Sequence, residues 1–268
     1  MRPLDPRIDA IRSLRDVVRR SRSGLFLAEG VRFLSLAEAK GVDVETVIIA
    51  PDIVTLPLAH EIAQRLRARG ATLYTVTAEV FHAITLQDEP QGVAAVMRQE
   101  WHSLDDIRPG DGLCWLALEG TKNPGNLGTA LRSAEAVGAA GLILIGPATD
   151  PYHPACVRAS MGSLFSQKLV RATASQVAKW AHAHGVTIVG TSPEAAQDYR
   201  EADFGRPTLL LMGSERKGLM ADTQRLCDVT VRIPMTGATD SLNLGVATSI
   251  LLYEVFRRSH PNPPEGRE

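Results

Sequence analysis

The chain has few features that would tie it to a membrane, a metal or an oxidising compartment. Its 268 residues include only three cysteines, Cys114, Cys156 and Cys227. An odd, widely spaced set of this kind is neither a disulfide framework nor a zinc-binding pattern. No apolar run reaches the roughly 18 residues that cross a bilayer, and no signal peptide is recognisable. We therefore expect a cytoplasmic protein with no membrane contact and no bound metal.

Several catalytic motifs are also missing. The chain contains no Walker lysine, no H-E-x-x-H and no G-x-S-x-G, and its seven histidines show no ligand spacing. A dinucleotide-binding loop needs G-x-G-x-x-G and an acidic residue about 20 positions later. Gly125 and Gly128 supply only part of that pattern, and the following strand ends in Gly146-Pro147 without an acid. The sequence therefore gives no support for a P-loop nucleotide-binding protein, a zinc metalloprotease, a serine hydrolase or a dinucleotide-binding enzyme.

The hydrophobic fraction of 44% and the charged fraction of 22% are typical of a globular protein, and the length suggests two domains. Residues 1–98 alternate between helical and strand patterns and predict a small α/β domain. The polar residues 99–112 are expected to be a linker. Residues 113–259 contain continuous apolar strands, as in a parallel sheet covered on both faces. The proline-rich residues 260–268 are expected to be a disordered tail.

Charge is low overall but uneven along the chain. The formal net charge of −1 does not indicate a strongly basic nucleic-acid binder, yet residues 2–22 hold seven arginines against three aspartates. A local basic arm of this kind can contact phosphates, although charge alone is equally consistent with a solvated helix face. Within the arm, the spacing of apolar residues predicts one helix over residues 7–20.

Three loops in the second half share one design, in which a buried strand is followed by a polar, glycine-containing turn and a helix. The candidate site residues are Asn123 and Asn126 in the first loop with Arg132 in the helix after it, Gly213 and Glu215 in the second loop, and Ser241 and Asn243 in the third. In open α/β sheets, ligands bind at the carboxyl ends of the strands, where such loops gather. We therefore expect the three loops to form one binding site.

The third loop lies in residues 233–254, which read as a strand end, a turn rich in threonine and glycine, and a long apolar helix. Asp240 or Ser241 is expected to cap that helix, because a short oxygen-bearing side chain accepts from the unpaired first-turn N–H groups. A core-facing stripe is expected on the helix. Its members are Leu242, Val246, Ile250 and Val255. An ordinary capped C-terminal helix would explain the same pattern.

The motifs of the three loops, in this order, resemble those of the SpoU family of RNA ribose 2′-O-methyltransferases. They are Asn123-Pro-Gly-Asn126-Leu-Gly128 with Arg132, then Leu211-Met-Gly-Ser-Glu215, then Ile233-Pro-Met-Thr-Gly with Ser241-Leu-Asn243. The first domain resembles the RNA-binding α/β extension of that family, through residues 26–32 and 89–93. The resemblance implies that the second domain is an α/β knot with a trefoil-threaded C-terminal segment, which works as a homodimer packed through its C-terminal helix.

The resemblance also implies a cofactor and a set of site residues. S-adenosylmethionine would sit in the knot, held largely by backbone around Gly213, Ile233 and Leu242. Arg132 would act on the target ribose hydroxyl, and four residues would arrange it and the RNA: Asn126, Glu215, Ser241 and Asn243. Four arginines are assigned to RNA contact: Arg19, Arg20, Arg22 and Arg32.

The role of Arg132 is open at this point. A guanidinium keeps its protons above a pH of about 12, so Arg132 is either a base assisted by an RNA phosphate or an electrostatic clamp for developing alkoxide charge. It could instead form a surface salt bridge with Glu135 or Glu119. Glu215 could simply be a carboxylate favoured by a helix N-terminus, and Asn243 a polar first-turn residue.

Two departures from the family pattern concern the second and third loops. Arg216 stands where relatives often carry glycine. Gly245 stands where a small polar residue is usual, which suggests close packing of its helix against the cofactor or a partner.

Together these features predict an S-adenosylmethionine-dependent RNA ribose 2′-O-methyltransferase. Ribosomal RNA is the first substrate considered, because the N-terminal domain type goes with ribosomal RNA enzymes more often than with transfer RNA enzymes. A transfer RNA methyltransferase is the nearest alternative. A non-catalytic RNA-binding or assembly factor on the same fold is a third. The presence of the full set of site residues argues against that third reading.

Overall fold

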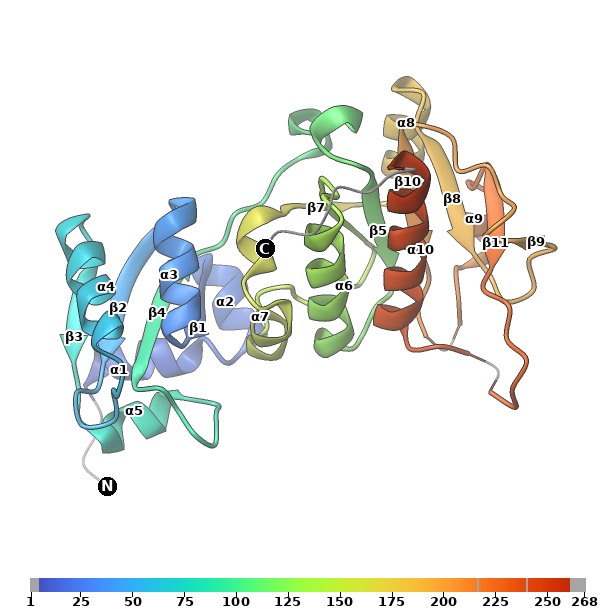
Figure 1. Cartoon of the computed structure of the whole chain (residues 1–268). Helices are drawn as coiled ribbons and strands as arrows, with labels where there is room; N and C mark the ends of the chain where they lie inside the picture. Colours follow the sequence, from blue (N-terminus) through green and yellow to red (C-terminus); the bar gives the residue numbers. More distant parts are fainter. Residues whose placement is uncertain (1–4, 216, 240, 261–268) are drawn as a thin grey trace. The chain divides into compact units, whose positions relative to one another are not determined.

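The computed structural model describes residues 5–215, 217–239 and 241–260. The chain forms two compact units (Figure 1). The first contains the chain up to Gln99 together with Asp150–Phe165, and the second contains the remainder. Segment Asp150–Phe165 interrupts the second unit in chain order but packs with the first, which was not predicted from the sequence. This segment contains α7 (Pro154–Ser160).

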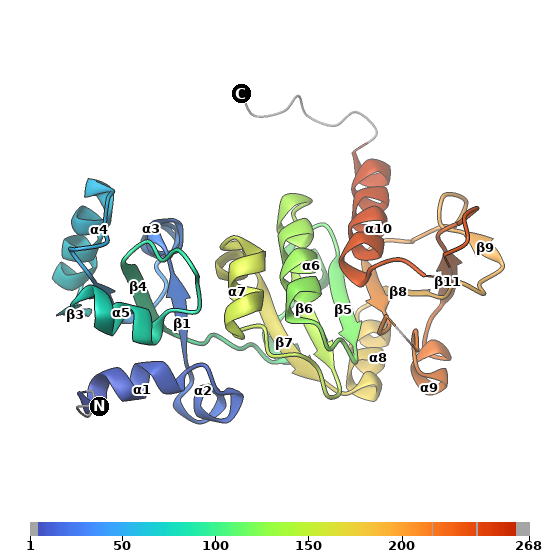
Figure 2. The ribbon, with the colours of Figure 1, turned by 90° about the horizontal axis from the view of Figure 1, so that it is seen from below.

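The first unit is built on a four-stranded mixed sheet. Its strands, in the spatial order β1-β4-β2-β3, are Leu25–Glu29, Val93–Arg98, Val44–Ile49 and Thr72–Thr75. Strand β4 is antiparallel to both neighbours, and β2 and β3 are parallel. Two helices contact the sheet on one face, α3 (Val31–Lys40) and α4 (Pro57–Ala68). On the other face, α1 (Pro6–Ser13) and α5 (Ala78–Ile84) enclose an apolar core (Figure 2).

The helix expected over residues 7–20 is two helices. After α1 the chain turns, and α2 (Val17–Ser23) begins at Asp16, whose carboxylate accepts from the backbone N–H groups of Val18 and Arg19. The cap satisfies two first-turn donors and so favours a new helix start at that point. Helix α2 ends at Gly24, which has a φ of 67°.

The second unit contains a seven-stranded sheet in which every neighbouring pair is parallel. Its spatial order is β7-β6-β5-β10-β8-β11-β9. In chain order the strands are β5 (Trp115–Glu119), β6 (Gly141–Ile145), β7 (Lys168–Ala172), β8 (Thr187–Thr191), β9 (Gln197–Asp198), β10 (Thr208–Met212) and β11 (Val229–Arg232). The predicted α/β class with a mostly parallel sheet is confirmed, and the knot stays a prediction.

Helices cover both faces of this sheet. Alternate residues of β5, Trp115 and Ala117, point into a core shared with Val177 and Trp180 of α8 (Ala174–Ala183). On the opposite face, α6 (Pro124–Ala136) and α10 (Leu244–Ser259) run side by side (Figure 1). A short helix, α9 (Ala221–Gln224), follows β10.

The polar stretch expected to be a linker packs closely on the second unit. Ile107 is fully buried in its core, and the indole N–H of Trp115 donates to the carbonyl of Arg108. The backbone N–H of His102 donates to the carbonyl of Leu169 on β7. Gln99 belongs to the first unit, and residues 100–112 belong to the second.

Within the described ranges, no helix is long and apolar enough to cross a bilayer, and no group of three or more His, Cys, Asp or Glu side chains could hold a metal ion. Arg216 and Asp240 lie outside the described residues, as does all but the first residue of the predicted tail.

Candidate functional site

The carboxyl ends of β10, β8 and β11 border a pocket in the second unit. Because these neighbouring strands are parallel, the loops that follow them emerge at one edge of the sheet. Residues of those loops, with the start of α10, line a cavity of about 630 Å³. That volume falls within the roughly 300–1,000 Å³ of small-molecule sites. Its position matches the strand-end crevice where open α/β sheets bind ligands.

Five of the residues predicted from the motifs line this pocket. They are Gly213, Glu215, Ile233, Ser241 and Leu242. The set contains every residue assigned to the cofactor. The other three predicted catalytic residues, on α6 and at the N-terminus of α10, are not among the lining residues.

The loop after β10 closes on itself beside the pocket. The backbone groups of Ser214 and Gly218 exchange hydrogen bonds of 3.0 and 2.9 Å, and Gly218 has a φ of 62°. A Cβ on Gly213 would lie 2.0–2.3 Å from the backbone of Gly218 and Leu219. Only glycine fits at position 213, so the shape of this loop depends on it.

Glu119, at the carboxyl end of β5, anchors the far end of the same loop. It is 7% exposed, and its carboxylate accepts from the backbone N–H of Met220 at 2.8 Å and from the hydroxyl of Thr223. From the sequence, Glu119 was considered only as a salt-bridge partner for Arg132. The available signal for a structural role was an acid at the end of an otherwise apolar strand.

A chain of hydrogen bonds joins the three motif loops. The side-chain NH₂ of Asn243 donates to Oδ1 of Asn126 at 2.8 Å, and the NH₂ of Asn126 donates to Oε1 of Glu215 at 2.6 Å. The Oδ1 of Asn243 accepts from the N–H groups of Gly245 and Val246. These contacts fix the orientation of both amides, with the donor of Asn243 on the Asn126 oxygen and the donor of Asn126 on the Glu215 carboxylate.

Glu215 lies in a closed turn, and the next helix begins only at Ala221, so a helix N-terminus does not explain it. Asn243 does have a local role, because it is the N-cap of α10. It also makes the contact with Asn126.

The expectation that Asp240 or Ser241 caps α10 was wrong as far as Ser241 is concerned. Ser241 is exposed and two residues before the cap, and Thr239 donates to its carbonyl. The predicted core stripe was also partly wrong, since Val246 is 47% exposed and the buried face of α10 includes Leu244 and Leu251. Because the helix starts at Leu244, Leu242 precedes it, and the buried residues of the helix differ from the predicted stripe.

Gly245 packs against the chain's own α6. A Cβ at Gly245 would lie 2.9 Å from the Cγ2 of Thr129. One turn further along, the hydroxyls of Ser133 and Ser249 are 2.6 Å apart. The small residue therefore allows the close approach of α6 and α10 that brings Asn126 and Asn243 together.

Arg132 lies on α6, is exposed, and has no hydrogen bond or ion pair among the described residues. The salt bridges considered with Glu135 and Glu119 are not present there. Arg132 follows Asn126 by six residues, which places it about 9 Å further along the axis and on a different side of the helix. Among the described residues, no hydrogen bond or ion pair joins it to the hydrogen-bonded residues of the three loops.

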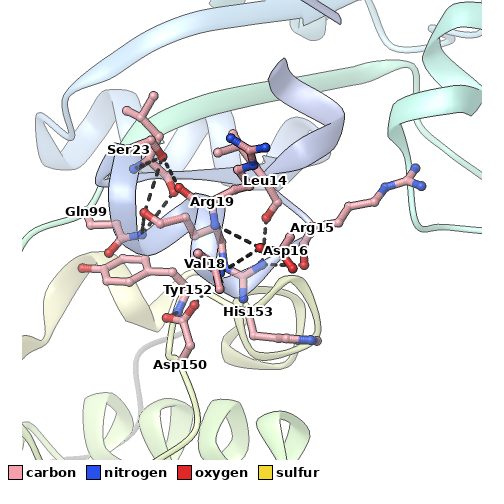
Figure 3. Close-up of polar contacts among 12 residues, drawn as sticks. Leu14, Arg15, Asp16, Val18, Arg19, Ser23, Gln99, Asp150, Tyr152 and His153 are labelled. Carbon is pink, nitrogen blue, oxygen red and sulfur yellow. Dashed lines mark hydrogen bonds and ion pairs between the residues drawn. The ribbon is translucent and has the colours of Figure 1, made fainter. Parts of the chain in front are cut away.

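The four arginines assigned to RNA differ in their surroundings. Arg20 is only 1% exposed: its Nε donates to Asp150 at 2.8 Å and its Nη1 donates to the carbonyls of Leu14 and Arg15 at 2.7 Å. Figure 3 labels these three partners. Arg20 is therefore corrected from an RNA contact to an interior residue of the first unit.

Arg19, Arg22 and Arg32 are exposed. The Nε of Arg32 donates to the carbonyl of Met161 at 3.0 Å, whereas the guanidinium groups of Arg19 and Arg22 have no partner among the described residues.

Thiol chemistry has no support at the pocket. Burial raises the pKa of Cys114 to about 12 and that of Cys227 to about 11, and it raises the pKa of Cys156 as well. All three thiols are thus protonated near neutral pH, and a protonated thiol is a poor nucleophile.

Comparison with known proteins agrees with this geometry. A family model described as SpoU rRNA Methylase matches residues 114–253, and one described as MRM3-like substrate binding domain matches residues 5–95. A 23S rRNA (uridine(2479)-2′-O)-methyltransferase from Streptomyces viridochromogenes is 36% identical over 90% of this chain and 85% of its own length.

Two solved structures are similar over nearly the whole chain. The AdoMet-bound rRNA methyltransferase from Sinorhizobium meliloti has a TM-score of 0.88 and 37% identity, covering 95% of each chain. The SpoU methyltransferase AviRb from S. viridochromogenes in complex with AdoMet has a TM-score of 0.86 and 34% identity, covering 96% of this chain and 98% of that one.

Proposed function

Because the chain belongs to the SpoU rRNA methylase family, we propose that it transfers a methyl group from S-adenosylmethionine to a ribose 2′-hydroxyl of 23S-type ribosomal RNA. Two of the relatives named above carry ribosomal RNA in their names, and two of the similar structures hold the cofactor. The observation in this chain that supports the proposal best is the hydrogen-bonded set Asn243–Asn126–Glu215, which joins three motif loops beside the pocket.

The pocket suits S-adenosylmethionine in size and lining. Apolar side chains such as Leu219, Ile233 and Leu242 can enclose an adenine ring, and the backbone around Gly213 can approach a ligand closely because no Cβ fits there. When bound, this cofactor supplies an electrophilic methyl group on a sulfonium. Glu119 supports the pocket indirectly, because it holds the loop that carries Gly213 and Glu215.

Methyl transfer to a hydroxyl needs the oxygen in line with the methyl carbon and the loss of its proton. Glu215 accepts from Asn126 through one oxygen, and its second oxygen has no partner among the described residues. We assign to Glu215, Asn126, Asn243 and Ser241 the positioning of the ribose. Arg132 acts on its hydroxyl, either as a phosphate-assisted base or by stabilising alkoxide charge.

A homodimer packed through the second unit belongs to the same proposal. Val246 is 47% exposed and Tyr253 53% exposed on the outer side of α10, and a second copy would cover both side chains. Arg132 has no partner among the described residues of its own chain, so a dimer offers a way to complete its site. The first unit would bind the RNA, and a ribosomal RNA substrate makes the cytoplasm the expected location.

The test is transfer of labelled methyl from S-adenosylmethionine to total RNA from a strain that lacks the gene. The RNA is separated into ribosomal and transfer fractions and then digested to nucleosides to locate the label. We expect label on ribose in the large ribosomal RNA. Label on a base, or none from protein that binds the cofactor, would contradict the proposal.

The same experiment decides between the alternatives. Ribose label confined to transfer RNA would favour a transfer RNA methyltransferase. Absence of both label and cofactor binding would favour a non-catalytic RNA-binding or assembly factor.

A further inference from the structure

The first unit contains a groove that no motif predicted. It is a cavity of about 470 Å³, bordered by α1, by α2 and by one face of the four-stranded sheet; its lining includes Ala10, Arg19, Arg22, Leu25 and Tyr74. We propose that this groove binds an unpaired nucleotide of the RNA, with its phosphate on Arg19 and Arg22 and its base over the apolar lining. The proposal rests on the proposed function, since it takes the ligand to be RNA.

The charge of the groove favours a phosphate. Arg19 and Arg22 both line it, and their guanidinium groups have no partner in the part of the chain that the structure describes. The carboxylate in the lining, Glu45, accepts from Arg98 at 3.1 Å. Among the described residues, no carboxylate pairs with either guanidinium group, and guanidinium groups bind phosphate through paired donors.

The interior of the groove favours a flat apolar group next to that phosphate. Ile11, Leu14, Leu25 and Val96 contribute to the lining. Tyr74 adds an aromatic ring, and the guanidinium of Arg7 lies 5.2 Å from its centre. Basic rims with aromatic and apolar surfaces are how proteins hold single-stranded nucleic acid, because each unstacked base offers a face for contact.

The buried Arg20 explains how α2 is held against the sheet. Arg20 lies between Arg19 and Arg22 in sequence but is buried, and it ties Asp150 to the carbonyls of Leu14 and Arg15. The side chain of Gln99 donates to the carbonyls of Arg20 and Leu25. These contacts hold the start of β1 against α2, so the groove is already formed without ligand.

The test uses the full-length protein and fluorescence anisotropy with a fluorescein-labelled oligouridylate, compared with an RNA duplex of the same length. Two pairs of variants test separately the free volume of the groove and the charge of its arginines. Ala10→Trp fills the groove without changing charge, and its control is Ala39→Trp on the exposed side of α3. Arg22→Ala removes a guanidinium from the groove, and its control is Arg67→Ala, an exposed arginine of α4.

We expect Ala10→Trp to weaken binding of the single strand on the order of tenfold, because a stacked base contributes about that much. The dependence of affinity on salt should not change in this variant. Arg22→Ala should weaken binding and reduce the slope of log K against log salt by about 0.7, the value for one lost phosphate contact on a single strand. Both controls should bind like the wild type, and the duplex should bind more weakly than the single strand.

Three results would overturn the proposal: Ala10→Trp binding as tightly as Ala39→Trp, Arg22→Ala behaving like Arg67→Ala, or the duplex binding as tightly as the single strand. If Ala10→Trp does not fold, Ala10→Glu replaces it, because a carboxylate there would repel the phosphate with little added bulk. The titration contains no cofactor. A protein that binds the strand as expected but labels no RNA would therefore contradict only the proposed function.

Discussion

In the second unit, the polar groups that follow β5, β10 and β11 are bonded to one another, whereas in the first unit neighbouring arginines of one helix have opposite surroundings. Asn126, Glu215 and Asn243 come from distant parts of the chain and form one hydrogen-bonded set. Arg19 and Arg20 are adjacent, yet one is exposed and the other is almost fully buried.

The difference shows what sequence motifs and charge patterns each indicate. A motif that combines a strand end, a turn and a helix start specifies geometry, so its polar residues meet where parallel strands end. A run of arginines specifies only charge, and packing decides which of them contacts solvent. The predictions below test both halves of this comparison.

The largest effect is expected from Gly213→Ala. A Cβ at this position would overlap the backbone of Gly218, so the loop after β10 must open and the cofactor pocket should lose its shape. We expect binding of S-adenosylmethionine, measured by calorimetry, to be lost and methyl transfer to fall at least 100-fold, on the order of what misplacing a reacting group costs. The control is Gly110→Ala, which has open space around it. Wild-type affinity in Gly213→Ala would show that this loop does not shape the site.

Arg20→Met should have the next largest effect, on stability. It leaves the Asp150 carboxylate without its buried partner, a change that costs about 3–5 kcal/mol. Arg19→Ala should change the free energy of unfolding by no more than about 0.5 kcal/mol. Both values come from urea unfolding followed by circular dichroism.

The double variant Arg20→Met with Asp150→Asn sharpens this contrast. It should cost less than the sum of the two single changes, because each removes the same ion pair. Additive costs, or equal costs for Arg19→Ala and Arg20→Met, would contradict the interior role of Arg20.

The smallest effects concern two carboxylates with opposite pH dependence. Hydrogen bonds from Arg257, and then from Arg258, lower the pKa of Glu254 in α10, whereas burial raises the pKa of Glu29 in β1. Unfolding therefore takes up a proton at Glu254 and releases one at Glu29 in their titration ranges. The stability that Glu254 contributes is present above its unfolded pKa and is lost as pH falls through its folded pKa. The contribution of Glu29 is present below its unfolded pKa and is lost as pH rises through its folded pKa.

Glutamine substitutions measure these contributions. Glu254→Gln should destabilise the protein by about 1 kcal/mol at neutral pH, and the difference from wild type should vanish in acid. For Glu29→Gln the pH dependence should be opposite: the free energy of unfolding of this variant, relative to wild type, should increase as pH rises. Unfolding free energies measured across acid and neutral pH test both. If the stability difference from wild type changed with pH in the same direction for both variants, the cause assigned to one of the two pKa shifts would be wrong.

Much of the second unit could be predicted from the sequence because its buried strands are continuous apolar runs. The continuous apolar strands expected within residues 113–259 include β6 and β10, whose residues are all buried. Strand β7 was missed, since Lys168 and Arg171 interrupt its pattern at the edge position next to β6. Segment Asp150–Phe165 could not be assigned to the first unit, because its contacts with distant residues such as Arg20 leave no local signal.

The sequence predicted which residues form the site better than it predicted the contacts between them. Strand-end motifs identified Gly213, Ile233 and Leu242, which line the pocket. The cap of α10 was misplaced by two residues or more because Ser241 and Asn243 are both good capping residues. Glu119 was not recognised as an anchor, since its partners Met220 and Thr223 are about a hundred residues away.

The most direct test of the proposed catalysis is single-turnover methyl transfer by Arg132→Ala at saturating S-adenosylmethionine and RNA. Arg132 has no hydrogen bond or ion pair among the described residues, so its removal should leave the fold and both binding steps unchanged. The rate of transfer should fall by about 10²–10⁴, the range for loss of a group that acts on the transferred proton. Arg158→Ala, at another exposed arginine, is the matched control. A wild-type rate from Arg132→Ala, with cofactor and RNA bound normally, would contradict the assignment of Arg132 as the residue that acts on the ribose hydroxyl.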